Sequence, residues 1–155
     1  QQIYSQVETY DLGEQLCECL LSFEEAWEKK ELQIETDVQE AVLVDADAQL
    51  LSLVWNNLFS NAIKFTEDNG KITLSLTTEG ENAVVRASDT GCGIPPEVGQ
   101  HIFEKFYQGD TSHAMAGNGL GLALALRVLQ LNDYKIEVES EPGRGSKFTV
   151  IIPKR

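Results

Sequence analysis

The sequence is poor in basic residues, in cysteine and in long apolar runs. Only 12 Lys and Arg stand against 25 Asp and Glu, for a net charge of −13. Nucleic acids and anionic membranes are bound through basic surfaces, so we expect neither as the main partner. The three cysteines, Cys17, Cys19 and Cys92, form no Cys-x-x-Cys pair, and there are only two histidines. This predicts neither a disulfide framework nor a zinc site, and reduced thiols in a cytoplasmic compartment are the simplest interpretation.

No apolar run approaches the roughly 18 residues that a membrane helix needs. The length of 155 residues suits one domain with a single core, and we expect residues 1–155 to form it. Apolar residues make up 42% and charged residues 24%, which is typical of a soluble globular protein. Because the chain opens at Gln1 and not at a methionine, we expect it to be a piece of a larger parent protein.

Hydrophobic periodicity predicts interleaved helices and strands. Asp11 and Glu14 resemble a capping box and precede a helical pattern that reaches Trp27, and Asp47 is expected to cap a helix over 48–65. Alternating or short apolar runs predict strands. They lie near 32–34, 42–44, 72–76, 83–87, 135–139 and 147–152. A short helix is expected before a mobile loop over 107–119, and a further helix over 120–131. The pattern favours an α/β two-layer sandwich, with a mixed, mostly antiparallel sheet and helices on one face.

The first group of candidate functional residues lies on the 48–65 helix. Asn57, Asn61 and Lys64 stand at i, i+4 and i+7 and therefore share one face of the helix. Two amide oxygens one turn apart suit a hard cation such as Mg²⁺, and a lysine one turn further on suits the phosphates that accompany it. The alternative is the solvated side of an ordinary amphipathic helix.

Three glycine-containing segments follow. The first, 89–94, reads Asp-Thr-Gly-Cys-Gly-Ile after a strand; its carboxylate can accept from an exocyclic amine such as that of adenine, unless it only closes a tight turn. The second, 117–122, opens a helix whose free N–H groups suit an anion, although it lacks the features of a P-loop or a Rossmann fingerprint. The third, 143–148, reads by itself as a hairpin turn.

The ordered set of four segments resembles the asparagine box and glycine boxes of the family shared by gyrase, the heat-shock chaperone, mismatch-repair ATPases and histidine kinases. Residues 57–66, 102–107 and 119–122 are most similar to the histidine kinase signatures. The resemblance covers roughly residues 9–153. It implies the Bergerat ATP-binding sandwich, with 107–119 as a lid over the phosphates and 1–8 as the end of a linker from a dimerisation domain.

The resemblance also implies the cofactors ATP and Mg²⁺ and a set of site residues. Catalytic roles fall to Asn57, Lys64 and Lys105, and Mg²⁺ ligation to Asn61 and Asn57. The implied nucleotide contacts are Asn57, Asn61, Lys64, Asp89, Gly91, Gly93, Ile94, Lys105, Tyr107, Gly117, Gly119, Leu120, Gly121, Leu122 and Ser146.

One position favours phosphoryl transfer over hydrolysis. In the ATPases of the family a glutamate opens the asparagine box and activates water, whereas here Asn57 stands there, and an amide is no base near neutral pH. The resemblance implies transfer of the γ-phosphoryl group to a histidine on a dimerisation domain outside this chain. His101 and His113 do not lie in a similar box, so we expect the chain alone to bind ATP without phosphorylating itself.

Two departures leave alternatives open. Gln108 stands where histidine kinases often have an arginine for the γ-phosphate, which favours a nucleotide-sensing module without transfer, and Ser146 replaces a frequent threonine but keeps the hydroxyl. A serine kinase of the anti-sigma type is a third possibility, against which the 102–107 segment argues. The further partners that the resemblance implies are a response regulator and, for the parent, a second copy in a homodimer, while the fragment itself is expected to be monomeric. The domain is expected in the cytoplasm, with the parent anchored in the cell membrane.

Overall fold

The computed structural model describes residues 6–91, 118–141 and 143–155. Its elements are β1 (Val7–Asp11), α1 (Leu12–Leu21), α2 (Glu24–Lys29), β2 (Gln33–Val38), β3 (Leu43–Asp47), α3 (Ala48–Phe65), β4 (Lys71–Glu79), β5 (Asn82–Asp89), α5 (Asn118–Leu131), β6 (Lys135–Glu141) and β7 (Gly145–Pro153).

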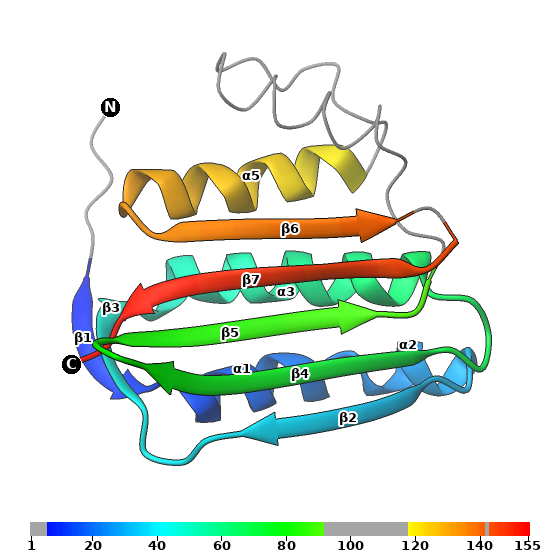
Figure 1. Cartoon of the computed structure of the whole chain (residues 1–155), viewed down its shortest axis with the longest axis horizontal. Coiled ribbons are helices and arrows are strands. Elements are labelled where there is room, and N and C mark those ends of the chain that lie inside the picture. Colours follow the sequence, from blue (N-terminus) through cyan, green and yellow to red (C-terminus); the bar gives the residue numbers. More distant parts are fainter. Residues whose placement is uncertain (1–5, 92–117, 142) are drawn as a thin grey trace.

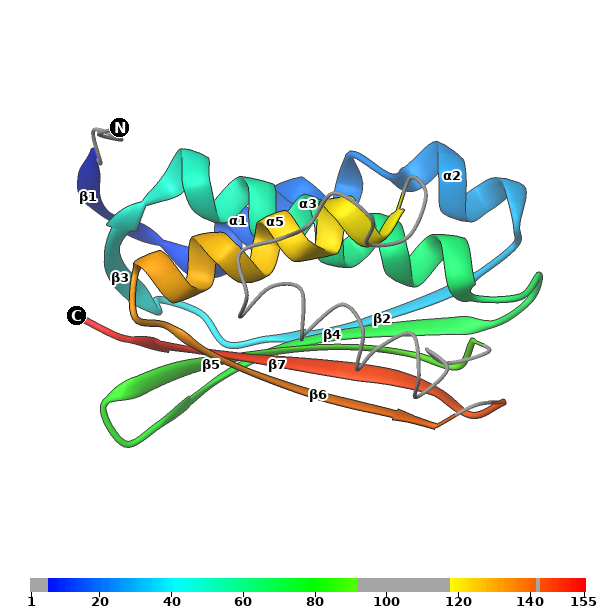
Figure 2. The same cartoon turned by 90° about the horizontal axis from the view of Figure 1, so that it is seen from above.

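The main sheet has five strands in the order β2-β4-β5-β7-β6, and only the β2–β4 pair is parallel. The described helices all lie on one face of it (Figure 1 and Figure 2). A separate two-stranded antiparallel sheet joins β1 to β3 at one end of the molecule. The expected two-layer α/β sandwich with a mixed, mostly antiparallel sheet is therefore confirmed. Among the described helices, none has the length and apolarity needed to cross a membrane.

Helix α3 has the bounds that the sequence predicts and forms the centre of the core. The Asp47 side chain caps it by accepting a hydrogen bond from the Leu50 N–H at 3.2 Å. Trp55 and Phe59 are at most 1% exposed and pack with apolar residues of the helix-facing side of the sheet. Each large side chain buried in this way contributes about 1.5–3 kcal/mol. This packing fixes which face of α3 is turned away from the core.

The helix expected to run to Trp27 is in fact two helices, α1 and α2. The Ser22 hydroxyl donates to the Cys19 carbonyl at 2.6 Å, which is the carbonyl that the Phe23 N–H would take in a continuous helix. The Phe23 N–H turns instead to the Leu20 carbonyl at 3.0 Å. A serine hydroxyl that competes for a backbone acceptor ends a helix in this manner, and α2 then starts at Glu24.

A buried hydrogen-bond network joins β1, α1 and α3 around Gln15. The Gln15 Oε1 accepts from the Tyr10 hydroxyl at 2.7 Å and from the Trp55 Nε1–H at 2.9 Å. Its Nε2 donates to the Ala48 carbonyl at 2.7 Å and to the Ser52 hydroxyl at 3.0 Å. All the hydrogen-bonding groups of the amide are thus used, so the network holds β1 firmly against α3.

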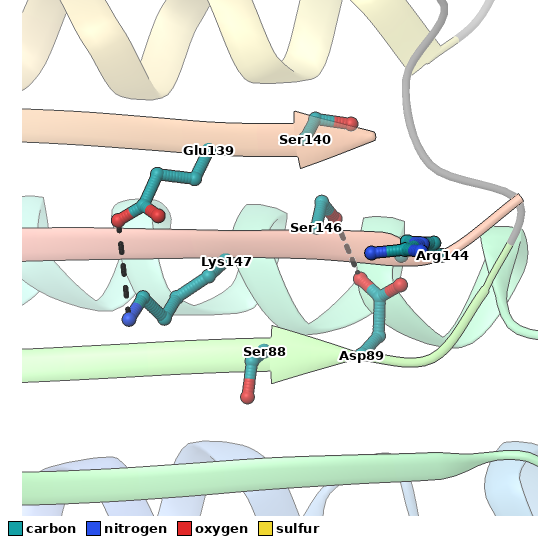
Figure 3. Close-up of a pocket in the computed structure, with 8 residues that line it drawn as sticks. Ser88, Asp89, Glu139, Ser140, Arg144, Ser146 and Lys147 are labelled. Carbon is teal, nitrogen blue, oxygen red and sulfur yellow. Dashed lines mark hydrogen bonds and ion pairs between the residues drawn. The ribbon is translucent and has the colours of Figure 1, made fainter. Parts of the chain in front are cut away.

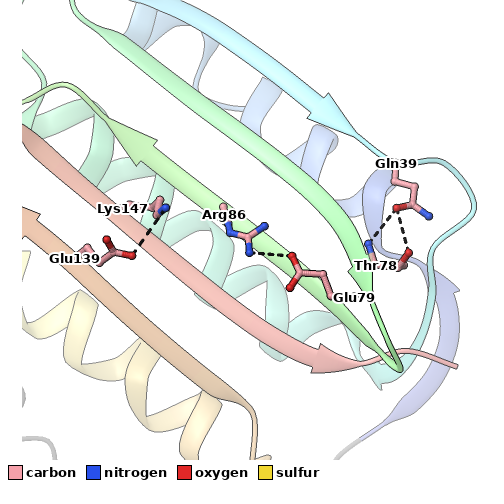
Figure 4. Close-up of polar contacts among 6 residues, drawn as sticks. All are labelled: Gln39, Thr78, Glu79, Arg86, Glu139 and Lys147. Atoms are coloured by element: carbon pink, nitrogen blue, oxygen red, sulfur yellow. Dashed lines mark hydrogen bonds and ion pairs between the residues drawn. The ribbon is translucent and has the colours of Figure 1, made fainter.

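The sheet face opposite the helices is polar in the described part of the chain. Arg86 pairs with Glu79 at 2.9 Å, and Lys147 approaches Glu139 at 3.9 Å (Figure 4). Exposed pairs of this kind contribute at most about 1 kcal/mol each. This face therefore serves mainly to keep the sheet solvated.

Some element boundaries differ from the sequence-based expectation. The first strand was not foreseen, and it begins at Val7, inside the segment 1–8 expected as a linker end. Helix α5 begins at Asn118, two residues inside the segment 107–119 expected as a loop. The rest of that loop and the short helix before it lie outside the described residues.

Candidate functional site

The three residues predicted on one face of α3 differ in their surroundings. Asn61 is buried, with 8% exposure, whereas Lys64 is exposed and Asn57 is half-buried. The Asn57 Nδ2 donates to the Leu53 carbonyl one turn earlier at 2.7 Å, which holds its amide in place. The Asn61 amide makes no hydrogen bond to any described residue. A nearly buried amide without a partner calls for a ligand or for water.

The chemistry of these two asparagines suits Mg²⁺. Within residues 6–91, 118–141 and 143–155 no group of three His, Cys, Asp or Glu could hold a metal ion. The amide oxygens of Asn57 and Asn61 stay the predicted ligands on α3, with phosphates and water expected to complete the shell of the ion. Mg²⁺ usually binds in this way, through few protein ligands.

The Asp89 carboxylate lies at the end of β5 and is held at both oxygens. Its Oδ2 accepts from the Ser146 hydroxyl at 2.8 Å (Figure 3). Its Oδ1 accepts from the Gly91 N–H at 2.9 Å. Burial raises the pKa of Asp89 above its ordinary value, and the hydrogen bonds from Ser146 and Gly91 offset only part of that effect. Each carboxylate oxygen keeps a second lone pair, so the group can accept a further donor from a ligand.

Two glycines bring the segments of the site together. A Cβ added to Gly91 would lie 2.1 Å from the Phe65 carbonyl oxygen, at the end of α3. Gly145 has a φ of +108°, and a Cβ there would lie 2.0 Å from the Asp89 carbonyl oxygen. Only glycine permits such close approach at both positions. The end of α3, the end of β5 and the start of β7 therefore meet at one place in the fold.

A cavity of about 290 Å³ opens at this end of the sheet. It is lined by Ser88, Asp89, Glu139, Ser140, Arg144, Gly145, Ser146 and Lys147. Arg144 and Lys147 bring positive charge to the lining of a chain whose net charge is −13. The lining comes from β5, β6, β7 and the turn between the last two, so the α3 residues Asn57, Asn61 and Lys64 lie outside this cavity.

The remaining predicted residues are only partly described. Gly119, Leu120, Gly121 and Leu122 lie in the first turns of α5, as the glycine-rich segment predicts, and their side chains are not described. The other predicted site residues lie outside the described part of the chain: Gly93, Ile94, Lys105, Tyr107 and Gly117.

Sequence reasoning missed two residues that shape the site. Gly145 is one, and the turn pattern Gly143-Arg144-Gly145 was the available signal for it. Lys30 is the other, because its ammonium group donates to three carbonyls at the end of α3. No sequence signal marks Lys30, since a lysine in a charged stretch normally faces solvent.

Fold and geometry together define a nucleotide-binding α/β sandwich, in which an asparagine-bearing helix meets a buried aspartate in a glycine turn. Residues 46–155 match the family model described as histidine kinase-, DNA gyrase B-, and HSP90-like ATPase. The chain belongs to this family, and within it corresponds to the catalytic ATP-binding domain of sensor histidine kinases.

Relatives of known sequence are much longer than this chain. The circadian input-output histidine kinase CikA of Synechococcus elongatus is 39% identical over an alignment 155 positions long, which covers 97% of this chain and 21% of that protein. Sensor histidine kinase RcsC of Escherichia coli is 43% identical over 122 residues, which are 77% of this chain and 12% of that protein. The chain thus spans about a fifth or less of these relatives.

Solved structures agree with the assignment. The catalytic domain of histidine kinase ThkA, in a nucleotide-free form, is 27% identical, with a TM-score of 0.81 and coverage of 96% of both chains. Full-length ShkA in complex with AMPPNP is 27% identical and has a TM-score of 0.81, with coverage of 98% of this chain and 32% of that one.

Proposed function

We propose that this domain binds ATP with Mg²⁺ and transfers the γ-phosphoryl group to a histidine on a dimerisation domain outside this chain. The observation that carries the proposal is the packing of the Asp89–Gly91 segment against the end of α3. Asp89 provides a charged acceptor for the base, and the amides of Asn57 and Asn61 on α3 provide ligands for a metal. The family match supports the same assignment.

At the base end, Asp89 is the proposed acceptor for the adenine amine. Ser146 and Gly91 hold the carboxylate by hydrogen bonds of 2.8 and 2.9 Å, so its orientation is fixed before a ligand arrives. A preorganised acceptor loses little entropy on binding. The glycines at 91 and 145 let the backbone of α3, β5 and β7 pack closely around Asp89, and Gly91 remains a proposed nucleotide contact.

At the phosphate end, Asn61 and Asn57 are the proposed Mg²⁺ ligands and Lys64 the proposed phosphate contact. When bound, Mg²⁺ neutralises charge on the phosphates during transfer. The Asn57 Nδ2 donates to the Leu53 carbonyl, so its amide oxygen is the atom left for the metal. An amide has no group that can take a proton from water. Without a base on α3 to activate water, transfer to an external nucleophile is favoured over hydrolysis.

The proposal extends to the parent protein. The ThkA kinase has been solved in complex with the response regulator protein TrrA, which supports a response regulator as a partner of this domain's parent. We further propose that the parent is a homodimer anchored in the cell membrane, with this domain on the cytoplasmic side, and that the isolated domain is a monomer. Lys105 remains a predicted catalytic residue and nucleotide contact, and Tyr107 a predicted nucleotide contact.

The test is to mix the domain with its separately produced dimerisation domain and ATP labelled at the γ-phosphate. We expect label on the dimerisation domain that is lost in acid and kept in alkali, as a phosphohistidine behaves, and no label on the domain alone. ATP binding without transfer would contradict the proposal in favour of a nucleotide sensor. Label that survives acid and is lost in alkali would contradict it in favour of a serine kinase.

A further inference from the structure

We infer that Lys30 is a positioning residue of the phosphate end of the site. Lys30 directly follows α2 and contacts the end of α3. It would act by fixing the last turn of α3, which carries Lys64 and directly follows Asn61. This inference rests on the proposed function, since it assigns a role to the phosphate end of that site.

The contacts of Lys30 use all three protons of its ammonium group. The Nζ donates to the carbonyls of Ile63 at 2.7 Å, Lys64 at 3.2 Å and Thr66 at 2.6 Å. The last carbonyls of a helix have no partner within the helix and carry the negative end of its dipole. A cation that binds three of them is therefore an effective cap for α3.

Lys30 and Gly91 contact different carbonyls at the end of α3. The Phe65 carbonyl, which Lys30 does not bind, is the one against which Gly91 packs. The four residues at the end of the helix are thus contacted by the Lys30 ammonium group and by the Asp89–Gly91 segment. A shift of this end would change the distance between the α3 residues and the base site.

Lys30 binds carbonyls of α3 although many carboxylates are present in the chain. The chain is strongly acidic, and Glu28 and Glu31 flank Lys30 in the sequence, yet no described carboxylate forms an ion pair with it. Its ammonium group instead donates hydrogen bonds to the carbonyls at the end of α3. Asp89, by contrast, is held by Ser146 and Gly91, so the base end does not depend on the Lys30 side chain for its hydrogen bonds.

Other hydrogen bonds hold the same region without the Lys30 side chain. The Asn69 N–H donates to the Lys30 carbonyl at 2.8 Å, and the Gln33 N–H donates to the Gly70 carbonyl at 2.8 Å. The Thr66 hydroxyl donates to the Ala62 carbonyl at 2.5 Å. Replacing the side chain should therefore leave the fold intact and free only the last turn of α3.

The experiment compares Lys30→Met, which keeps the aliphatic length and removes the charge, with Lys29→Met, an exposed neighbour, as the matched control. Dissociation constants for Mg²⁺-ATP and for adenosine are measured by calorimetry at a temperature where circular dichroism shows all proteins folded. For Lys30→Met we expect about tenfold weaker Mg²⁺-ATP binding with adenosine binding within about twofold of wild type. Lys29→Met should bind both ligands as wild type does.

Unchanged Mg²⁺-ATP binding by Lys30→Met would overturn the inference. An equal loss of affinity for Mg²⁺-ATP and for adenosine would also overturn it, because a general loss of stability does not discriminate between the two ends of the nucleotide. If Lys30→Met fails to fold, Lys30→Gln is measured in its place and judged by the same two results. A wild-type domain that binds no Mg²⁺-ATP would refute the proposed function itself, and is thereby distinct from failure of the Lys30 inference.

Discussion

Replacing Asp89 by asparagine should weaken ATP binding without weakening the fold. The asparagine is nearly isosteric, so its oxygen can still accept from the Gly91 N–H, and its Nδ2 can donate to the Ser146 hydroxyl, which rotates to accept. What is lost is the charged acceptor for the adenine amine. Stability and affinity should therefore change independently.

The magnitude of the affinity loss follows from the kind of bond removed. A hydrogen bond to a charged group contributes about 1–3 kcal/mol, which corresponds to an increase of roughly 5- to 150-fold in the dissociation constant. The sign of the stability change follows from the raised pKa of Asp89. A carboxyl whose pKa is raised in the folded state stabilises the fold only while protonated, and that contribution is lost as the pH rises through the folded value. At pH 7 the neutral amide should thus be at least as stable as the carboxylate.

The assay combines calorimetric titration with ATP and urea unfolding at pH 7, with Asp37→Asn, an exposed position on β2, as the control. We expect Asp89→Asn to lose ATP affinity while its free energy of unfolding stays equal to or above that of wild type, and the control to match wild type in both. An unchanged dissociation constant would refute Asp89 as the base acceptor. A large drop in stability would refute the account of its hydrogen bonds.

Two further predictions concern the packing around the site and the Gln15 network at the start of α3. In Gly91→Ala the added Cβ would collide with the Phe65 carbonyl, so we expect a loss of about 1–3 kcal/mol in stability together with weaker ATP binding, and unfolding curves that match wild type would contradict the close approach. Burial raises the pKa of Tyr10, and the neighbouring Tyr134 raises it further. The neutral form of Tyr10 therefore stabilises the fold fully at pH values below its unfolded pKa of about 10, and stabilises it less as the pH rises above that value. Tyr10→Phe should therefore be about 1 kcal/mol less stable than wild type at pH 7, through loss of the bond to Gln15, with a difference that shrinks above pH 10 in urea unfolding; a constant difference would contradict this.

Local patterns predicted much of the fold. The bounds of α3 follow from the Asp47 cap and from apolar residues repeating at three and four, because a core helix must bury one continuous stripe. The grouping of Asn57, Asn61 and Lys64 on one face follows from the same geometry. The inward face of β4 was visible as alternation, since that strand has one face on the core, whereas β5 was visible as a short apolar run.

What the sequence did not reveal depends on contacts between distant segments. The pairing of β1 with β3 brings together strands separated by a helix pair and a strand, and neither carries a strong alternating pattern. The break after α1 depends on which acceptor the Ser22 hydroxyl takes, and a serine in a helical pattern is compatible with either result. Lys30 is a similar case, because the carbonyls that it binds lie 33 to 36 residues away.

The most direct test of the proposed phosphoryl transfer is to compare Asn61→Asp with Asn56→Asp in the labelling assay with the dimerisation domain, at saturating ATP and Mg²⁺. Asn56 lies on the same helix but is exposed, so both variants add the same charge to α3 and only one changes the proposed metal ligand. We expect Asn61→Asp to lose most of its transfer while its affinity for adenosine is retained, and Asn56→Asp to transfer as wild type does. Wild-type transfer by Asn61→Asp, or equal loss in both variants, would contradict the assignment of the metal and of the reacting phosphate to this face of α3.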